Sequence, residues 1–207
     1  MNQMGAQGPV RYSLAFSEIS ATSQPSRRRA TLVRPLSRRF ARLPSVPASP
    51  TEEPSHPTVR EASARDIPEI LRQRRRMYED MHYNDPHTLD TMASLSSAYL
   101  TAAMADGSFR AWLAADQDRV VAGGAVVISP WPAHPYDLQC RRATILNVYT
   151  DPEYRRRGIA RKLMQTMIAW CKREGFARVT LHASDDGRAL YESLGFEASN
   201  EMRLKLR

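Results

Sequence analysis

The residues best suited to chemistry lie in one stretch, 147–163, with the sequence NVYTDPEYRRRGIARKL. An apolar run, 145–150, precedes a turn at Asp151 and Pro152, and an arginine-rich segment containing Gly158 then opens an amphipathic helix. Gly158 allows a ligand to approach the backbone closely, and the first amides of the following helix have no intrahelical partners. These groups predict an anion site made of backbone amides, suited to a phosphate or pyrophosphate.

Two motifs around this stretch resemble those of the GNAT N-acetyltransferase superfamily. Residues 155–160, RRRGIA, are similar to the family signature R/Q-x-x-G-x-G/A, which takes the pyrophosphate of acetyl-CoA. Residues 189–196, ALYESLGF, are similar to a second family block, a helix carrying Y-E-x-L-G-F. The two blocks stand in the family's order, about thirty residues apart.

The resemblance implies acetyl-CoA as co-substrate, without a metal, and direct transfer of the acetyl group to an amine. In the family, the strand equivalent to 145–150 splays from the strand equivalent to 177–183, and a main-chain amide near Val148 would stabilise the thioester oxyanion. A solvated basic helix start is the alternative for the arginines, but the matched block favours ligand contact through the amides 156–161. The implied cofactor-binding residues are Val148, Tyr149, Thr150, Arg155, Arg156, Arg157, Gly158, Ile159, Ala160 and Arg161.

Two side chains are catalytic candidates. The departing CoA thiolate needs a proton, and the family often supplies it from the tyrosine of Y-E-x-L-G-F, here Tyr191; a tyrosine that serves only packing and binding is the alternative. As general base, His182 on the expected fifth strand competes with a water held by Asn147 and Ser184, and a purely structural histidine is the third interpretation. The family's N-x-x-A before the tyrosine is absent, since Ser184 and Gly187 occupy those positions.

Charge is concentrated at the N-terminus. The 207-residue chain carries a net charge of +8, but residues 1–51 hold eight arginines and one acid (+7), which leaves +1 for residues 52–207. A nucleic-acid-binding face on the folded part is therefore not supported, although the basic tail could add weak, salt-sensitive affinity for polyanions.

The cysteines and the apolar runs exclude two further classes. Cys140 and Cys171 are too few for a disulfide framework and lack metal-ligand spacing, and Cys171 is expected to be a buried thiol. Because no apolar run approaches the roughly 18 residues that cross a bilayer, we expect a soluble, cytoplasmic protein without a membrane partner.

The segment 1–56 is rich in serine, proline and arginine, which predicts a disordered extension, because such a segment cannot offset its ordering entropy by burying apolar surface. The same composition suits an organelle transit peptide, and import remains open. A start codon placed too far upstream, or a dispensable extension, is the alternative.

Residues 57–207 are expected to form one domain. Asp66 and Pro68 mark a helix entry, Gly123 and Gly124 a bulge or close backbone packing, and Gly175 a helix end. The expected strands are 58–62, 109–115, 120–128, 143–150 and 177–183, with a final strand or hairpin at 196–206. Four helices are expected. The first begins near residue 66, the second and third cover 88–105 and 156–174, and the fourth begins at Asp185 or Asp186.

Two regions are candidates for an acceptor pocket. The first is the end of the first helix, where the family usually forms part of that pocket, although a solvated helix end is the alternative for its charged members; it holds Tyr78, Glu79, Asp80, His82 and Tyr83. The second is the loop 129–139, whose aromatic residues could roof a pocket or pack on the domain's own edge; it holds Trp131, His134 and Tyr136.

These observations predict an α/β domain with the GNAT acyl-CoA N-acyltransferase fold, in which a mixed, mostly antiparallel sheet is flanked by helices. The expected activity is N-acetylation of a primary amine. A small-molecule acceptor is favoured over a protein, with a lean toward a cationic one from Glu79 and Asp80. A non-catalytic acyl-CoA-binding regulatory module is the alternative, and a homodimer is left open.

Overall fold

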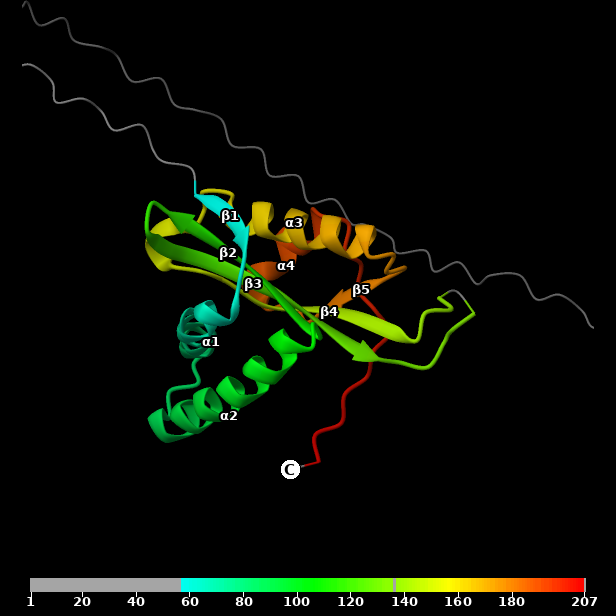
Figure 1. The fold of residues 1–207 in the computed structure, drawn as a ribbon, viewed down its shortest axis with the longest axis horizontal. Helices are drawn as coiled ribbons and strands as arrows, with labels where there is room; N and C mark the ends of the chain where they lie inside the picture. The colour runs from blue at the N-terminus through cyan, green and yellow to red at the C-terminus, as the bar shows by residue number, and fades with distance from the viewer. Residues whose placement is uncertain (1–56, 136, 207) are drawn as a thin grey trace, which may run out of the picture. The chain divides into compact units, whose positions relative to one another are not determined.

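The computed structural model describes residues 57–135 and 137–206, so the extension expected at 1–56, and Tyr136, lie outside the described residues. The described strands form one sheet in the order β1-β2-β3-β4-β5 (Figure 1). Neighbouring strands are antiparallel except β4 and β5, which are parallel. The strands are β1 (Thr58–Glu61), β2 (Phe109–Asp116), β3 (Arg119–Pro130), β4 (Arg141–Thr150) and β5 (Val179–Leu181).

Helices cover both faces of this sheet: α1 and α2 lie on one side, and α3 and α4 on the other (Figure 1). The expected mixed, mostly antiparallel sheet flanked by helices is therefore confirmed. The helices are α1 (Ile67–Asp80), α2 (Pro86–Ala105), α3 (Ile159–Arg173) and α4 (Asp185–Glu192), with 3-10 turns at Ala64–Asp66 and Pro152–Tyr154.

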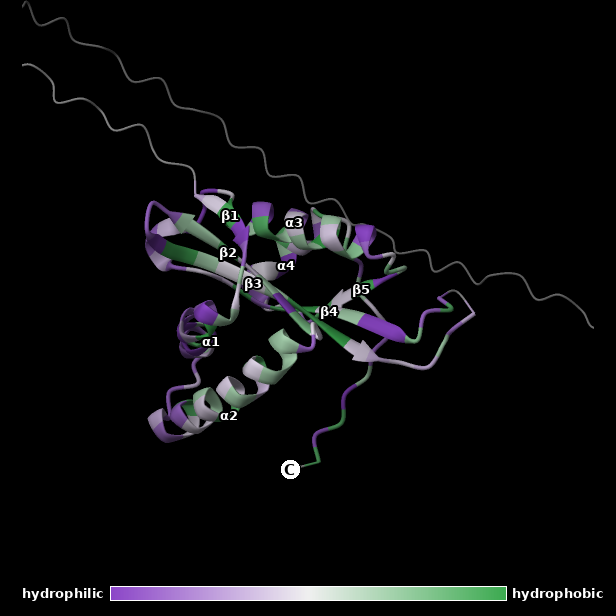
Figure 2. Cartoon of the chain, viewed as in Figure 1, coloured by the Kyte–Doolittle hydropathy of each residue, from purple (hydrophilic) through white to green (hydrophobic). Residues whose placement is uncertain are grey.

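Alternation along β2 divides the interior into two cores. Phe109 and Leu113 are buried with residues of α1 and α2, whereas Trp112 and Ala114 are buried with residues of α3, because successive side chains of a strand point to opposite faces. Figure 2 shows the matching pattern on α3, where hydrophobic and hydrophilic residues alternate around the helix. Apart from Arg110 and Asp116 the side chains of β2 are apolar, and this strand is thus the floor of both cores.

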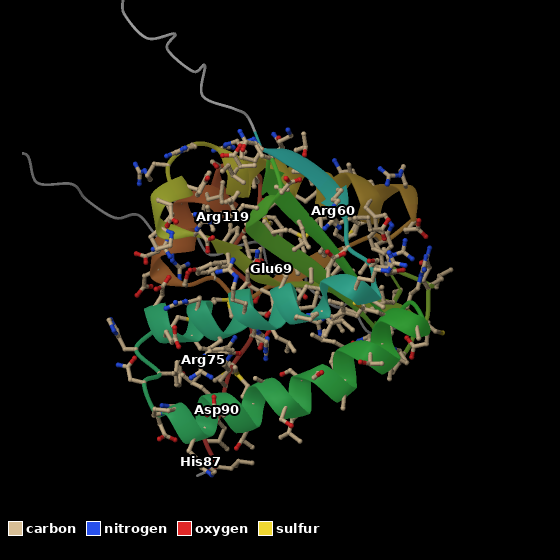
Figure 3. All side chains as sticks on the ribbon, turned by 60° about the vertical axis from the view of Figure 1, so that its left-hand side comes forward. Arg60, Glu69, Arg75, His87, Asp90 and Arg119 are labelled. Atoms are coloured by element: carbon tan, nitrogen blue, oxygen red, sulfur yellow. The ribbon has the colours of Figure 1, made fainter. Side chains whose placement is uncertain are left out.

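An ion pair ties α2 to α1. Arg75 on α1 donates to Asp90 on α2 at 2.5 Å, and its Nε also contacts Glu79 at 3.0 Å; Figure 3 shows Arg75 and Asp90 facing each other between the two helices. At the start of α2 the Asp85 side chain accepts from the Thr88 amide at 2.9 Å, and burial of Leu89 and Leu100 completes the contact.

Both features predicted for Gly123 and Gly124 in β3, a bulge and close backbone packing, are present. The pairing of β3 with β4 shifts register between Gly123 and Ala125. A Cβ atom at Gly123 would lie 2.3 Å from Gln73 Oε1 and 2.9 Å from Leu113 Cδ2, so α1 approaches the strand too closely for a side chain.

We expect Gly123→Ala to lower the free energy of unfolding by about 1–3 kcal/mol, because Gln73 and Leu113 are both buried and must shift. Gly124→Ala is the matched control: its Cβ would meet the end of the Met167 side chain, at 2.7 Å from Cε and 3.2 Å from Sδ, and Val148 Cγ2 only at 3.6 Å, and the flexible methionine end can move. Urea denaturation of both variants measures the difference, and a greater loss for Gly124→Ala would contradict this account.

Three expected boundaries are wrong. The helix expected at 156–174 begins at Ile159, because Arg156 and Gly158 have left-handed φ angles of 63° and 78° that no α-helix contains. The strand expected at 177–183 is limited to Val179–Leu181. The strand or hairpin expected at 196–206 is not formed: Met202, Leu204 and Leu206 alternate as in a strand but are exposed, since no described strand pairs with this segment.

The loop 129–139 packs on its own hairpin. β3 continues to Pro130, His134 and Asp137 form an isolated β-bridge, and the Arg142 guanidinium lies 4.8 Å from the centre of the Trp131 ring. Because this loop joins the start of β4, it lies about 20 Å along the strand from Asn147. The described part of the loop therefore packs on its own hairpin, away from Asn147, and it also lines a cavity with Arg178 and Thr180.

Candidate active site

A β-bulge interrupts β4 near its centre. Gly123 pairs with Tyr149 and Ala125 with Leu146, so two residues of β4, Asn147 and Val148, oppose the single residue between them on β3. Asn147 has a φ of 55°, a left-handed conformation that asparagine tolerates better than most residues. A bulge bends its strand and redirects the neighbouring backbone groups, which here include the Val148 amide.

β4 separates from β5 just before this bulge. The parallel pairing covers only Ala143 to Ile145 against β5, and in the described chain the outer edge of β4 has no strand beside it from Leu146 to Thr150. The Thr150 hydroxyl is buried, and none of the residues in the described ranges hydrogen-bonds it. This opening is the splay that the family resemblance implies, and it leaves a strand edge able to hydrogen-bond a ligand.

The end of β4 is anchored by a buried carboxylate. Asp151 is 3% exposed and accepts from Arg72 at 3.1 Å and from Arg119 at 3.2 Å, while its amide donates to Val121 O at 2.8 Å. Arg119 is among the residues labelled in Figure 3. Helix α1 and strands β3 and β4 are thereby joined at the point where the arginine-rich loop begins. The sequence marked Asp151 only as a turn residue.

The three arginines of the loop differ in their contacts. Arg155 pairs with Asp80 on α1 and donates from Nε to Thr150 O at 3.0 Å, and Arg157 donates to Glu153 O at 2.7 Å. Arg156 makes no hydrogen bond or ion pair with any residue that the structure describes. The side chains of Arg155 and Arg157 therefore hold the loop in shape, and any anion contact is left to the backbone and to Arg156.

Gly158 is the N-cap of α3, with a left-handed φ of 78°. The first amide of the helix to donate along it belongs to Lys162, which bonds Gly158 O at 3.1 Å. The preceding amides of Ile159, Ala160 and Arg161 have no helical acceptor, and residues 155–158 are exposed. The backbone at the start of α3 thus presents donors at the positive end of a 15-residue helix, an arrangement suited to binding an anion.

Tyr191 lies on α4, which Ser184 caps by accepting from the Gly187 amide at 3.3 Å. Its ring packs closely over Gly187 and meets Phe196 edge-on at 6.1 Å, against the same core that Val148 contacts. Its hydroxyl donates to none of the described residues. Burial raises the pKa of the phenol above its usual value, which keeps it a proton donor at neutral pH.

His182 was expected on the fifth strand, but this position is wrong: β5 ends at Leu181, and His182 directly follows it. Its side chain is 64% exposed, and its Nε2 lies 3.5 Å from a carboxylate oxygen of Glu201. The water hypothesis loses support, because Asn147 Oδ1 already accepts from Arg74 at 2.6 Å and Ser184 caps α4.

The end of α1 borders the bulge. Tyr78 and Tyr83 meet edge-to-face at 5.6 Å, and the Arg74 guanidinium lies 5.1 Å from the centre of the Tyr78 ring. Arg74 was not among the site residues that the sequence predicted. Its contact with Asn147, 73 residues away, has no local signal.

Two absences complete the description. Within the part of the chain that the structure describes, no group of three or more histidine, cysteine, aspartate or glutamate side chains could hold a metal ion. Among the helices of that same part, none has both the length and the apolar composition for a membrane span.

Sequence and structure comparisons agree with this geometry. The sequence model of a family described as "Acetyltransferase (GNAT) family" matches residues 68–196, more than half of the chain. The chain belongs to the acetyltransferase (GNAT) family. A GCN5-related N-acetyltransferase from Ralstonia eutropha JMP134 is 32% identical, with a TM-score of 0.67 over 72% of this chain and 98% of that one.

Two further likenesses are more distant. A predicted acetyltransferase from Clostridium acetobutylicum, whose structure contains acetyl-CoA, shares the fold at 24% identity, with a TM-score of 0.66 over 73% of this chain and 96% of that one. Human N-acetyltransferase 8 is 26% identical over 122 residues, which are 58% of this chain and 50% of that protein. The chain therefore spans about half the length of this curated relative.

Proposed function

We propose that this chain transfers the acetyl group of acetyl-CoA to a primary amine of a small molecule by direct attack within a ternary complex. The observation that carries the proposal is the bulged β4, whose unpaired outer edge leads into a loop and then into a helix capped by left-handed Gly158. The strand edge suits the pantetheine arm and thioester, and the helix start suits the pyrophosphate. Both belong to one continuous segment.

The acyl transfer needs one positioned donor and one proton donor. The neutral amine attacks the thioester carbonyl carbon, the C–N bond forms, and the negative charge that develops on the carbonyl oxygen is stabilised by the Val148 amide. The C–S bond then breaks as the carbonyl re-forms, and Tyr191 protonates the departing thiolate. The proton released by the attacking nitrogen passes to His182 or to a water, and from there to solvent.

The structure does not support the predicted preference for a cationic acceptor. It depended on Glu79 and Asp80, yet Glu79 pairs with Arg75 and Arg76, and Asp80 pairs with Arg155. A carboxylate already neutralised by a guanidinium attracts a further cation weakly. We therefore base no charge preference on these two residues.

A thiol-release assay across amine classes tests the proposed function. With acetyl-CoA and an accepted amine, free CoA should appear in step with an N-acetylated product detected by mass spectrometry. The exposed Cys140 would react with thiol reagents, so Cys140→Ser removes that background, whereas Cys171 is buried, and burial raises its pKa to about 11.

The same assay separates the enzyme from a non-catalytic acyl-CoA-binding module. Such a module would bind acetyl-CoA in calorimetry but release no CoA with any amine. Binding without release across amino acids, polyamines and peptide N-termini would therefore contradict the proposed transfer.

A further inference from the structure

Arg74 differs from its neighbours on α1 in having no carboxylate partner. The arginines of the run RQRRR otherwise pair with acids: Arg72 with Glu69 and Asp151, Arg75 with Glu79 and Asp90, and Arg76 with Glu79. No ion pair joins Arg74 to a residue in the described ranges. The positive charge of Arg74 is therefore not offset by a neighbouring carboxylate in the described part of the chain, unlike the charges of the other arginines in this run.

The surroundings of this guanidinium satisfy it only in part. Its Nη1 donates to Asn147 Oδ1 at 2.6 Å and its Nη2 lies 3.4 Å from the Tyr78 hydroxyl, while its Nε is buried with no acceptor among the described residues. A guanidinium offers five N–H donors, and leaving one buried and unpaired is unfavourable. An anion placed here would therefore gain both the charge and the free donors.

Arg74 lies beside the reacting centre of the proposed enzyme. Its acceptor, Asn147, is the residue of the bulge that directly precedes Val148, and adjacent Cα atoms are about 3.8 Å apart. A group bound by Arg74 would therefore lie beside the bulge that contains the amide assigned to the thioester oxyanion. The CoA phosphates do not compete for this position, since the helix start that suits them follows the strand at Gly158.

We propose that Arg74 binds the carboxylate of the acceptor, and that the acceptor is an α-amino acid or a derivative that keeps its free α-carboxylate. This inference rests on the proposed function. The placement of Arg74 beside the bulge favours an α-amino acid, because one carbon atom separates its amine from its carboxylate. A protein N-terminus has an amide at this position and would leave Arg74 unpaired. The edge-to-face pair of Tyr78 and Tyr83 next to Arg74 suits an apolar side chain on the acceptor.

The test compares L-phenylalanine with L-phenylalaninamide, which differ only at the carboxyl group. In the full chain, Arg74→Gln should lower kcat/KM for phenylalanine by about 10- to 100-fold, mainly through KM, because a charge-assisted hydrogen bond is lost. The value for the amide should stay near that of the wild type, and so should the acetyl-CoA Kd. Arg76→Gln is the matched control. Arg76 is exposed, and its one ion pair within the described ranges is with Glu79, so this variant should change kcat/KM for neither substrate.

Calorimetric titration of phenylalanine into the CoA-bound protein keeps this inference distinguishable from the proposed function. Binding of phenylalanine that is lost in Arg74→Gln, without CoA release by any amine, would support the carboxylate site and refute the transfer. Equal losses for phenylalanine and its amide would assign Arg74 a structural role and overturn the inference. The inference would also be overturned if CoA were released faster with phenylalaninamide than with phenylalanine, at the same rate in the wild type and in Arg74→Gln.

Discussion

Gly158→Gln is expected to abolish acetyl-CoA binding in calorimetry while leaving the circular dichroism spectrum unchanged. The glutamine side chain would project from the backbone that presents the amides of Ile159 to Arg161, where the pyrophosphate is proposed to lie. Hydrogen bonds to charged groups contribute about 1.5–3 kcal/mol each, so the loss of two of them exceeds a hundredfold in affinity. Space alone does not explain the glycine, since a Cβ there meets nothing within 4 Å.

Gly107→Gln is the matched control for this variant. Gly107 has the same φ of 78° and the same open surroundings, but it lies between α2 and β2. In both variants a non-glycine residue in the left-handed conformation lowers the free energy of unfolding by about 1–2 kcal/mol. Only Gly158→Gln should lose acetyl-CoA binding. Wild-type affinity in Gly158→Gln, or equal losses in the two variants, would refute the backbone anion site.

Tyr191→Phe is expected to lower kcat by about 100- to 10,000-fold, the range typical of a positioned proton donor, without changing the acetyl-CoA Kd. The ring packs against Phe196 and over Gly187, so phenylalanine should keep the packing and remove only the hydroxyl. Steady-state kinetics with a saturating amine measure the effect. Tyr99→Phe, on the half-exposed face of α2, should leave turnover unchanged.

The pH profile offers a second measurement of the same role. A general acid must be protonated to act, and burial raises the Tyr191 pKa, so its activity should persist through neutral pH and fall only above the ordinary phenol value of about 10. This alkaline decline of kcat should be absent from the residual activity of Tyr191→Phe. Turnover at the wild-type rate in the variant would assign the hydroxyl to binding or packing only.

Local patterns predicted most of the elements. Helical spacing predicts an apolar stripe on α3 at Ile159, Leu163, Met164, Met167, Ile168 and Cys171. All six pack in one core and all but the half-buried Ile168 are fully buried, because helical periodicity fixes which side chains share a face. Gly175 ends this helix with a left-handed φ of 78°, as its residue type indicated. The boundary at the other end was wrong, because arginine favours helix locally and nothing in the sequence reveals that Arg156 turns left-handed.

By itself the sequence determined the family, the alternation of strands and helices, and the glycine that precedes α3, since these depend on spacing and residue type within a few turns of chain. Only the tertiary structure decided where β4 bulges, that the segment 196–206 finds no strand to pair with, and that Arg74 meets Asn147. Those outcomes depend on contacts between residues far apart in the chain, and a periodic pattern states which face a residue occupies but not what lies opposite it.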